Sequence, residues 1–386
     1  MFKFAFLVCT IAALAYRYYG LLDIDKKLVE PKGQTCHLLG KDTAGSVEDL
    51  VTYKKGMLIG GSGDTIAAAR ESPEKARPGY FVLVDVRSGK PVLKKLKVTG
   101  TPKVFRLQPH GLFYSEKTKR LYAVNHGGVS GIGTRVEMFN VREGADGLPE
   151  LEWVMPIGGG HLFPNIALNS VVEGNDNEIY ASIWQNAPIP DAGEHHPRTI
   201  TDYLGRALQR IVEIGAVAGF TSVQRCVFDV ASKSTIQCKA VASGFAVANG
   251  ITMNKNRDVL YVNDVVLKRI YVYSVNKKTG QLTQAKDQTI ILPHAVDNIH
   301  MDHETGEIWM GSIALIFEQF DTKAKKAGTF VAYNPKNNKL TDEIVHDGSV
   351  LSQLATCMWV TNPGSGEKWA ACSSPLSDGI LMCQRK

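Results

Sequence analysis

The sequence lacks three features that define common protein classes. It has no basic stripe: 44 Lys and Arg against 38 Asp and Glu leave a net charge of +6, and the basic residues are scattered among turns such as 117–120 and 255–257. A nucleic-acid surface needs clustered basic side chains, so that function is excluded. Gly and Pro follow no period, which excludes collagen-like and low-complexity chains. No Asn-x-Ser/Thr sequon occurs, so we expect no N-glycosylation.

The N-terminal apolar run, residues 4–16, falls short of the about 20 residues that a membrane-spanning helix needs. It follows Met1-Phe-Lys and precedes Arg17, and Ala13-Leu-Ala15 is a candidate cleavage site. This pattern predicts a signal peptide or an uncleaved signal-anchor at 1–16, followed by a connecting segment at 17–35. Either one places the protein in the secretory pathway, secreted or membrane-anchored, in an extracellular or ER-lumenal space. The missing sequons favour the internal, membrane-attached location.

The cysteines agree with that compartment. One of the seven, Cys9, lies in the apolar run, which leaves an even number in the rest of the chain: Cys36, Cys226, Cys238, Cys357, Cys372 and Cys383. An even set in a secretory protein predicts disulfides. The sequence alone does not fix their pairing.

A pattern recurs six times along the chain. A pair of polar or small residues precedes a short alternating strand, a turn and a more apolar second strand. The pairs are Glu48-Asp49, His110-Gly111, Asn169-Ser170, Asn249-Gly250, Asp297-Asn298 and, more loosely, Ser352-Gln353. Repeats of about 40 to 60 residues with about four strands each are typical of propeller blades. The sequence therefore predicts an all-β fold, a single six-bladed β-propeller domain over 36–386. We expect an N-terminal strand to pair with C-terminal strands in one closing blade.

The segment 185–225 interrupts the repeat. A Pro-rich loop is followed from Thr199 by apolar residues at i, i+3, i+4 and i+7 spacing, with charged residues on the other face. This spacing predicts an inserted amphipathic helix over 199–214. Placed between two blades, such a helix would lie at one end of the propeller and cover the tunnel mouth or contact a membrane or lipoprotein surface.

The repeat also predicts where the chemistry lies. The innermost strand of each blade runs beside the central channel, so equivalent positions meet there. Two carboxylates and three amides share this register: Glu48, Asp297, Asn169, Asn249 and Asn298. Calcium takes six to eight oxygen ligands at about 2.3–2.6 Å and prefers these groups. No Cys or paired His joins the set, which disfavours zinc.

Each of these pairs has a structural explanation of its own. Asn249-Gly250 is the commonest hairpin turn signal, the acidic pairs fit solvated turns, and His110 fits a hydrogen-bonded core histidine. The shared register favours a site, because independent turns have no reason to place oxygen donors at one equivalent position in four copies.

Two histidines could supply a general base beside this calcium. His110 belongs to the repeated set, and His126 ends the next strand of the same copy. A histidine that titrates near neutrality suits proton abstraction from water. Glu48 or Asp297 could orient the water instead. A calcium that polarises a carbonyl next to such a base predicts ester or lactone hydrolysis.

From about Cys36 to Cys383 the chain resembles the paraoxonase/arylesterase family. The residues that carry the resemblance are SVEDL at 46–50, QPHGL at 108–112, VNH at 124–126, FPN…NS at 163–170, SGFAVANGI at 243–251 and VDNIHMDHETGEIWMG at 296–311. The resemblance implies a six-bladed propeller with two calcium ions in the tunnel and hydrolysis of lactones and aryl esters.

The resemblance also assigns residues. It implies that the catalytic calcium is held by Glu48, Asn169, Asn249, Asp297 and Asn298. It implies a histidine dyad of His110 and His126, a disulfide between Cys36 and Cys383 that would lock the closing blade, and a retained hydrophobic N-terminus.

The chain departs from the family pattern in the insertion at 185–225, which is longer than usual, and at two further places. The second calcium of the family uses two aspartates; one matches Asp49, but the other position is Ser170 here, which puts a second ion in doubt. Around 63–65, where the family has an apolar and aromatic pocket wall, this chain has Asp64 and small residues. Substrate preference is therefore not inherited.

Two other functions remain open. One is a non-catalytic, membrane-tethered paraoxonase-like protein that assists the assembly of membrane proteins, which the missing sequons and the altered pocket wall favour. The other is a sugar-lactone hydrolase of a neighbouring propeller family, which the cysteines near both ends and the ANG and VDN contexts disfavour.

Overall fold

The computed structural model describes residues 34–64, 77–126, 134–159, 167–185, 219–313 and 325–385. The apolar segment 1–16 and the helix predicted at 199–214 both lie outside these residues. In the part of the chain that is described, no helix is both long and apolar enough to cross a membrane.

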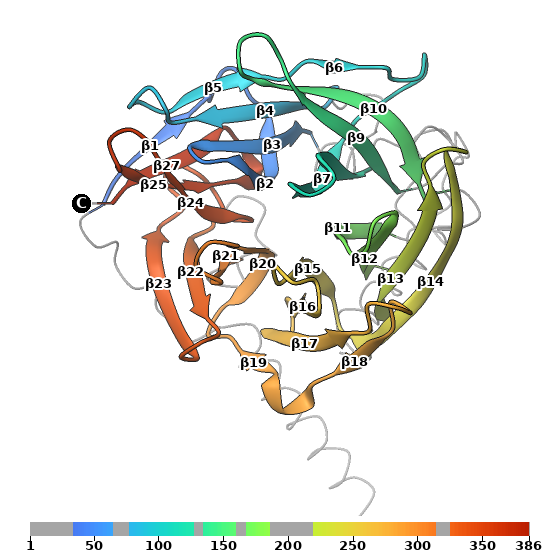
Figure 1. Ribbon diagram of the computed structural model, residues 1–386. Coiled ribbons are helices and arrows are strands. Elements are labelled where there is room, and N and C mark those ends of the chain that lie inside the picture. The colour runs from blue at the N-terminus through green and yellow to red at the C-terminus, as the bar shows by residue number, and fades with distance from the viewer. Residues whose placement is uncertain are drawn as a thin grey trace, which may run out of the picture.

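The described strands form six sheets arranged as blades around a central axis, which confirms the predicted six-bladed propeller (Figure 1). Blade 1 contains β2 (Ser46–Lys54), β3 (Met57–Gly63), β4 (Tyr80–Asp85) and β5 (Val92–Lys95), with β26 (Ser374–Asp378) paired to β2. Blade 2 contains β7 (Pro109–Ser115), β8 (Arg120–Asn125), β9 (Arg135–Glu143), β10 (Pro149–Ile157) and β6 (Val98–Thr99). Blade 3 contains β11 (Ala167–Glu173), β12 (Glu178–Gln185), β13 (Thr221–Asp229) and β14 (Ser234–Phe245).

The remaining blades repeat the plan. Blade 4 contains β15 (Ala248–Met253), β16 (Val259–Asp264), β17 (Arg269–Val275), β18 (Leu282–Gln284) and β19 (Ile290–Ile291), and a short 3-10 helix, η2 (Lys286–Gln288), precedes β19. Blade 5 contains β20 (Ala295–Met301), β21 (Ile308–Ile313), β22 (Gly328–Asn334) and β23 (Lys339–His346). Blade 6 contains β24 (Cys357–Thr361), β25 (Lys368–Cys372), β27 (Ile380–Gln384) and β1 (Thr35–Leu39).

Blade 6 closes the ring as predicted. Its outermost strand β1 comes from the N-terminal side of the chain and pairs antiparallel with β27 near the C-terminus. Cys36 and Cys383 are direct cross-strand partners in this pair and form a disulfide across 347 positions. A cross-link that spans so much of the chain removes a large part of the unfolded state's freedom, which stabilises the closed ring.

Two further disulfides connect neighbouring strands within blades. Cys226 pairs with Cys238 across β13 and β14, and Cys357 pairs with Cys372 across β24 and β25. All six cysteines of the described part are thereby oxidised, which agrees with a secretory compartment.

Apolar side chains on both faces of the inner strands pack the blades against one another. Every residue of β11 and of β15 is buried, and the rings of Phe81 in blade 1 and Phe139 in blade 2 meet edge to face at 5.2 Å. This packing fixes the inner strands against the axis, so any side chain that points into the channel is held on a rigid support.

Five inner strands carry a bulge at the same register. In β2, Val47 faces Ser62 and Leu50 faces Gly60, so Glu48 and Asp49 together oppose one residue. Equivalent shifts occur in β7, β11, β15 and β20, at 110–111, 169–170, 249–250 and 297–298. The repeated pairs therefore lie inside the inner strands, as bulges, and not before them. A bulge re-aims its side chains, and it is common beside active sites.

The sixth pair is not where the sequence placed it. Ala355 and Thr356, rather than Ser352 and Gln353, directly precede β24, and Ala355 O accepts the backbone N–H of Asn298. Residues 354–356 lie between Ser352-Gln353 and the first residue of β24. The pair predicted from the repeat was therefore three residues too early.

Candidate functional site

The first residue of each bulge supplies a polar side chain to the axis. Glu48, Asn169, Asn249 and Asp297 are each at most 7% exposed, and they come from blades 1, 3, 4 and 5. Their burial is unusual, because acidic and amide side chains are mostly exposed unless they are paired. The inner strands thus bring together residues that are widely separated in the sequence.

Hydrogen bonds join these side chains into two connected pairs. Asn298 Nδ2 donates to Glu48 Oε1 at 2.9 Å, and the side chain of Asn249 hydrogen-bonds that of Asp297. On the other side of Glu48, His110 Nδ1 lies 3.4 Å from Glu48 Oε2.

Four oxygen atoms of this group are left without a donor. Glu48 Oε2, Asn169 Oδ1, Asn249 Oδ1 and Asn298 Oδ1 are buried and have no hydrogen-bond partner among the described residues. A buried acceptor without a partner costs about 1–3 kcal/mol, and native proteins retain such groups only for a reason. All four are hard oxygen acceptors of the kind that calcium binds, so these residues fit a calcium ion. In the described part no three His, Cys, Asp or Glu side chains gather, so the fit depends on the amides.

The two carboxylates are also destabilised in their charged form. Burial raises the pKa of Glu48 well above its usual range, and the nearby charges of Asp297 and Asp49 raise it further. Burial likewise raises the pKa of Asp297, against the lowering effect of hydrogen bonds from Asn249 and Gln353. A divalent cation between them would remove this penalty.

The two predicted histidines lie together on the rim of this group. The rings of His110 and His126 meet edge to face with centroids 4.8 Å apart. Burial lowers the pKa of His110 to about 4, and burial together with the neighbouring His110 lowers that of His126 well below its usual value. Both imidazoles are therefore neutral at pH 7.

The tautomer of His110 follows from its partner. Its Nδ1 lies 3.1 Å from the carbonyl oxygen of Asn169, which can only accept a hydrogen bond. Nδ1 must therefore carry the proton, which leaves the Nε2 lone pair free to accept one.

Sequence reasoning missed two side chains that support the group. Thr134 Oγ1 lies 3.1 Å from His126 Nδ1. Gln353 donates from Nε2 to Asp297 Oδ2 at 3.4 Å and adopts a left-handed backbone conformation, φ 61°. A non-glycine residue at positive φ is uncommon and often marks a functional position. The sequence indicated Gln353 only as a member of the loose sixth pair, and Thr134 belongs to none of the motifs.

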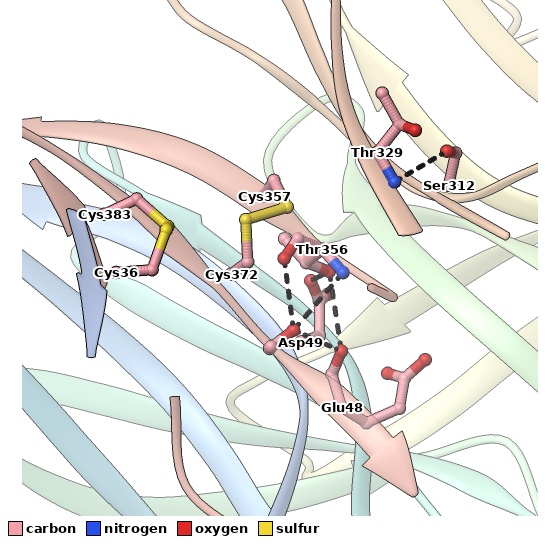
Figure 2. Close-up of a disulfide and its surroundings, with 10 residues drawn as sticks. Cys36, Glu48, Asp49, Ser312, Thr329, Thr356, Cys357, Cys372 and Cys383 are labelled. Atoms are coloured by element: carbon pink, nitrogen blue, oxygen red, sulfur yellow. Dashed lines mark hydrogen bonds between the residues drawn. A yellow bond between two sulfur atoms is a disulfide. The ribbon is translucent and has the colours of Figure 1, made fainter. Parts of the chain in front are cut away.

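Asp49 differs from its neighbour Glu48, because protein donors surround its carboxylate. Oδ1 accepts the Leu50 amide at 2.8 Å, Thr356 Oγ1 at 2.6 Å and His300 Nε2 at 2.7 Å. Oδ2 accepts the Leu112 amide at 2.7 Å. Figure 2 shows Thr356 over Asp49, beside the Cys357–Cys372 disulfide, with the side chain of Glu48 pointing away from them.

Asp64, the acid in the altered pocket wall, lies 3.4 Å from the guanidinium of Arg77, which also contacts Asp378 at 3.1 Å. Its backbone N–H donates to Gln108 Oε1 at 2.9 Å. Gln108 is next to Pro109, the first residue of the strand that carries His110. The substitution therefore places an ion pair where the resemblance implies an apolar wall.

Comparison with known proteins agrees with this geometry. A family model described as Arylesterase matches residues 221–356. Human serum paraoxonase/arylesterase 2 is 25% identical over 353 residues, which cover 90% of this chain and 85% of that protein. Mouse serum paraoxonase/lactonase 3 is 28% identical over 289 residues, or 74% of this chain and 70% of that protein. These matches show that the chain is similar to proteins of the paraoxonase/arylesterase family.

The structural comparison bears on the fold alone. A luciferin-regenerating enzyme aligns over 92% of this chain and 96% of its own, at a TM-score of 0.50 and 12% identity. The part of the chain that the Arylesterase model matches contains Asn249, Asp297 and Asn298. The resemblance noted in the sequence is thereby confirmed.

Proposed function

We propose that this protein hydrolyses carboxylic esters, either aryl esters or lactones, at a calcium ion on the propeller axis. The calcium would be held by Glu48, Asn169, Asn249, Asp297 and Asn298. The observation that carries the proposal is the set of four buried oxygens that have no donor among the residues the structure describes, contributed by four blades and next to two neutral histidines. The names of the relatives, arylesterase and lactonase, support the reaction class.

A calcium ion bound there supplies a Lewis acid that polarises the substrate carbonyl and stabilises the oxyanion. The remaining work falls to the protein. His110 takes the proton of the attacking water at Nε2, because the Asn169 carbonyl keeps the other proton on Nδ1. A low pKa ensures that this nitrogen is unprotonated at pH 7.

His126 and Thr134 hold the base in place. The edge-to-face contact with His126 restricts rotation of the His110 ring, and Thr134 restricts that of His126. Glu48 and Asp297 could orient the water instead of His110, as one carboxylate oxygen of Glu48 has no donor.

The test is an esterase assay on purified protein with phenyl acetate and a panel of lactones, with and without EGTA. We expect turnover that is lost on chelation and in Asn249→Ala. The matched control is Asn337→Ala, which removes an exposed amide on the outside of blade 5 and should leave turnover intact.

Calcium binding without turnover on any substrate would instead favour the non-catalytic, membrane-tethered role.

In either role we place the protein in the secretory pathway, with residues 1–16 as signal or anchor, 17–35 as the connecting segment and 36–386 as one domain. Its membrane or lipoprotein contact would use the N-terminus and the helix at 199–214. Extraction of the full chain from membranes with alkaline carbonate tests the tether.

A further inference from the structure

The family resemblance implies a second calcium at Asp49, but the residues present there do not fit one. An ionised carboxylate has about two acceptor positions on each oxygen. Three donors already crowd Asp49 Oδ1, namely Leu50 N, Thr356 Oγ1 and His300 Nε2, and Leu112 N donates to Oδ2, all at 2.6–2.8 Å. A cation that bound both oxygens of Asp49 would have to displace the hydrogen bonds at Oδ1. The other family aspartate is Ser170, which brings no charge.

The contrast with the neighbouring residue is direct. Glu48 and Asp49 belong to one bulge and are both fully or almost fully buried, at 2% and 0% exposed. Glu48 Oε2 has no hydrogen-bond partner among the described residues, whereas each oxygen of Asp49 accepts at least one protein donor. The same bulge therefore presents one carboxylate with an open oxygen and one carboxylate whose two oxygens both bind protein donors.

The imidazole of His300 acts as a donor here and not as a metal ligand. Because an ionised carboxylate only accepts hydrogen bonds, His300 Nε2 must carry the proton that it shares with Asp49 Oδ1. A nitrogen that carries a proton has no lone pair for a metal. His300 is 8% exposed, so it also fills the space beside Asp49.

We propose that Asp49 binds protein donors in place of a second cation, and that this axial network ties four blades together without metal. Asp49 lies in β2 of blade 1, Leu112 in β7 of blade 2, His300 in β20 of blade 5, and Thr356 directly before β24 of blade 6. A structural metal on the axis would make the same cross-links. The chain keeps them by hydrogen bonds to one buried charge, which are stronger than those between neutral groups.

The test counts metal and measures melting on the same samples. Wild-type protein is saturated with calcium and desalted, and calcium per chain is measured by mass spectrometry. Tm is then measured in excess EGTA for wild type, His300→Leu and His300→Gln. The control is His294→Leu, because the pair of His294 with Asp342 is weaker, at 3.6 Å, and Asp342 is 40% exposed.

We expect no more than one calcium per wild-type chain. His300→Leu leaves a buried carboxylate short of a donor, and should lower Tm in EGTA by about 5 °C or more. His300→Gln retains an N–H donor and should recover at least half of the loss, and His294→Leu should cost no more than about 2 °C.

Two calcium ions per wild-type chain, or a His300→Leu protein that melts in EGTA at the wild-type temperature, would overturn the proposal. If His300→Leu does not fold, Thr356→Val removes another donor and provides the same comparison. The outcome does not depend on the proposed hydrolysis. A chain that binds no calcium but shows the expected Tm losses would contradict the calcium mechanism and still support the network.

Discussion

Asn298 Nδ2 and Glu48 Oε1 meet at 2.9 Å although 250 positions separate the two residues in the sequence. The amide nitrogen of Asn298 thereby orients Glu48, while its buried Oδ1 has no donor in the described part of the chain and is available to the proposed ion. An apolar residue of similar size at either position would therefore remove the hydrogen bond that orients the other side chain.

Asn298→Leu should therefore weaken calcium binding by about 100-fold or more, because it removes one ligand and the partner that orients another. Competition with a chelating dye measures this affinity. The Asn337→Ala protein is the control, and its calcium affinity should equal that of wild type. Equal affinities in Asn298→Leu and wild type would contradict the assigned ligand set.

His110→Gln should separate proton transfer from metal binding. Gln keeps an N–H that can donate to the Asn169 carbonyl but offers no basic nitrogen, so kcat on phenyl acetate should fall by about 10²–10⁴-fold while calcium affinity stays within a few-fold of wild type. Steady-state kinetics at saturating calcium measure the effect. Wild-type kcat in this variant would show that a carboxylate, not His110, is the base.

Arg257 should be important for stability and not for chemistry. Glu173 is 0% exposed and accepts hydrogen bonds from Ser115, Thr118, Tyr122 and Arg257, which join blades 2, 3 and 4 away from the calcium site. Arg257→Met leaves a buried carboxylate without its cation and should destabilise the fold by about 3–5 kcal/mol.

Urea denaturation of Arg257→Met measures that free energy of unfolding. The matched control is Lys117→Met, which breaks an exposed pair with Asp176 and should cost less than about 1 kcal/mol. Similar losses in the two variants would show that burial does not decide the strength of these pairs.

His346 should make stability depend on pH. Burial lowers its pKa below the ordinary value of 6.5, and its Nδ1 accepts the Gly348 amide, a bond that protonation breaks. Since the folded state binds this proton more weakly than the unfolded chain, the contribution is full above pH 6.5 and is lost as the pH falls below it. The fall in Tm between pH 7.5 and pH 5.5 should be smaller in His346→Asn than in wild type; an equal fall would assign the dependence to other groups.

The sequence was sufficient for the architecture because every copy of the repeat carries its own strand and turn signals. The closure expected from six copies, with an N-terminal strand paired to C-terminal strands in one blade, is also what the structure has. The residues at 48, 110, 169, 249 and 297 could be grouped because their register is the same in five blades.

What the sequence could not provide depends on backbone irregularity and on packing across blades. The bulges, and the displaced sixth position at Ala355 and Thr356, are set by how each inner strand meets its neighbours. The network around Asp49 needed His300, which the sequence did not identify as a partner because it lies outside the repeated pair at 297–298.

The closing blade also constrains how the protein is made. Strand β1 can find its partner only after Ile380–Gln384 has left the ribosome, so an edge strand formed early in synthesis waits unpaired through nearly the whole of translation. Unpaired edges promote association with other chains. We therefore expect the nascent chain to depend on folding factors of its compartment until oxidation of Cys36 and Cys383 completes the circle.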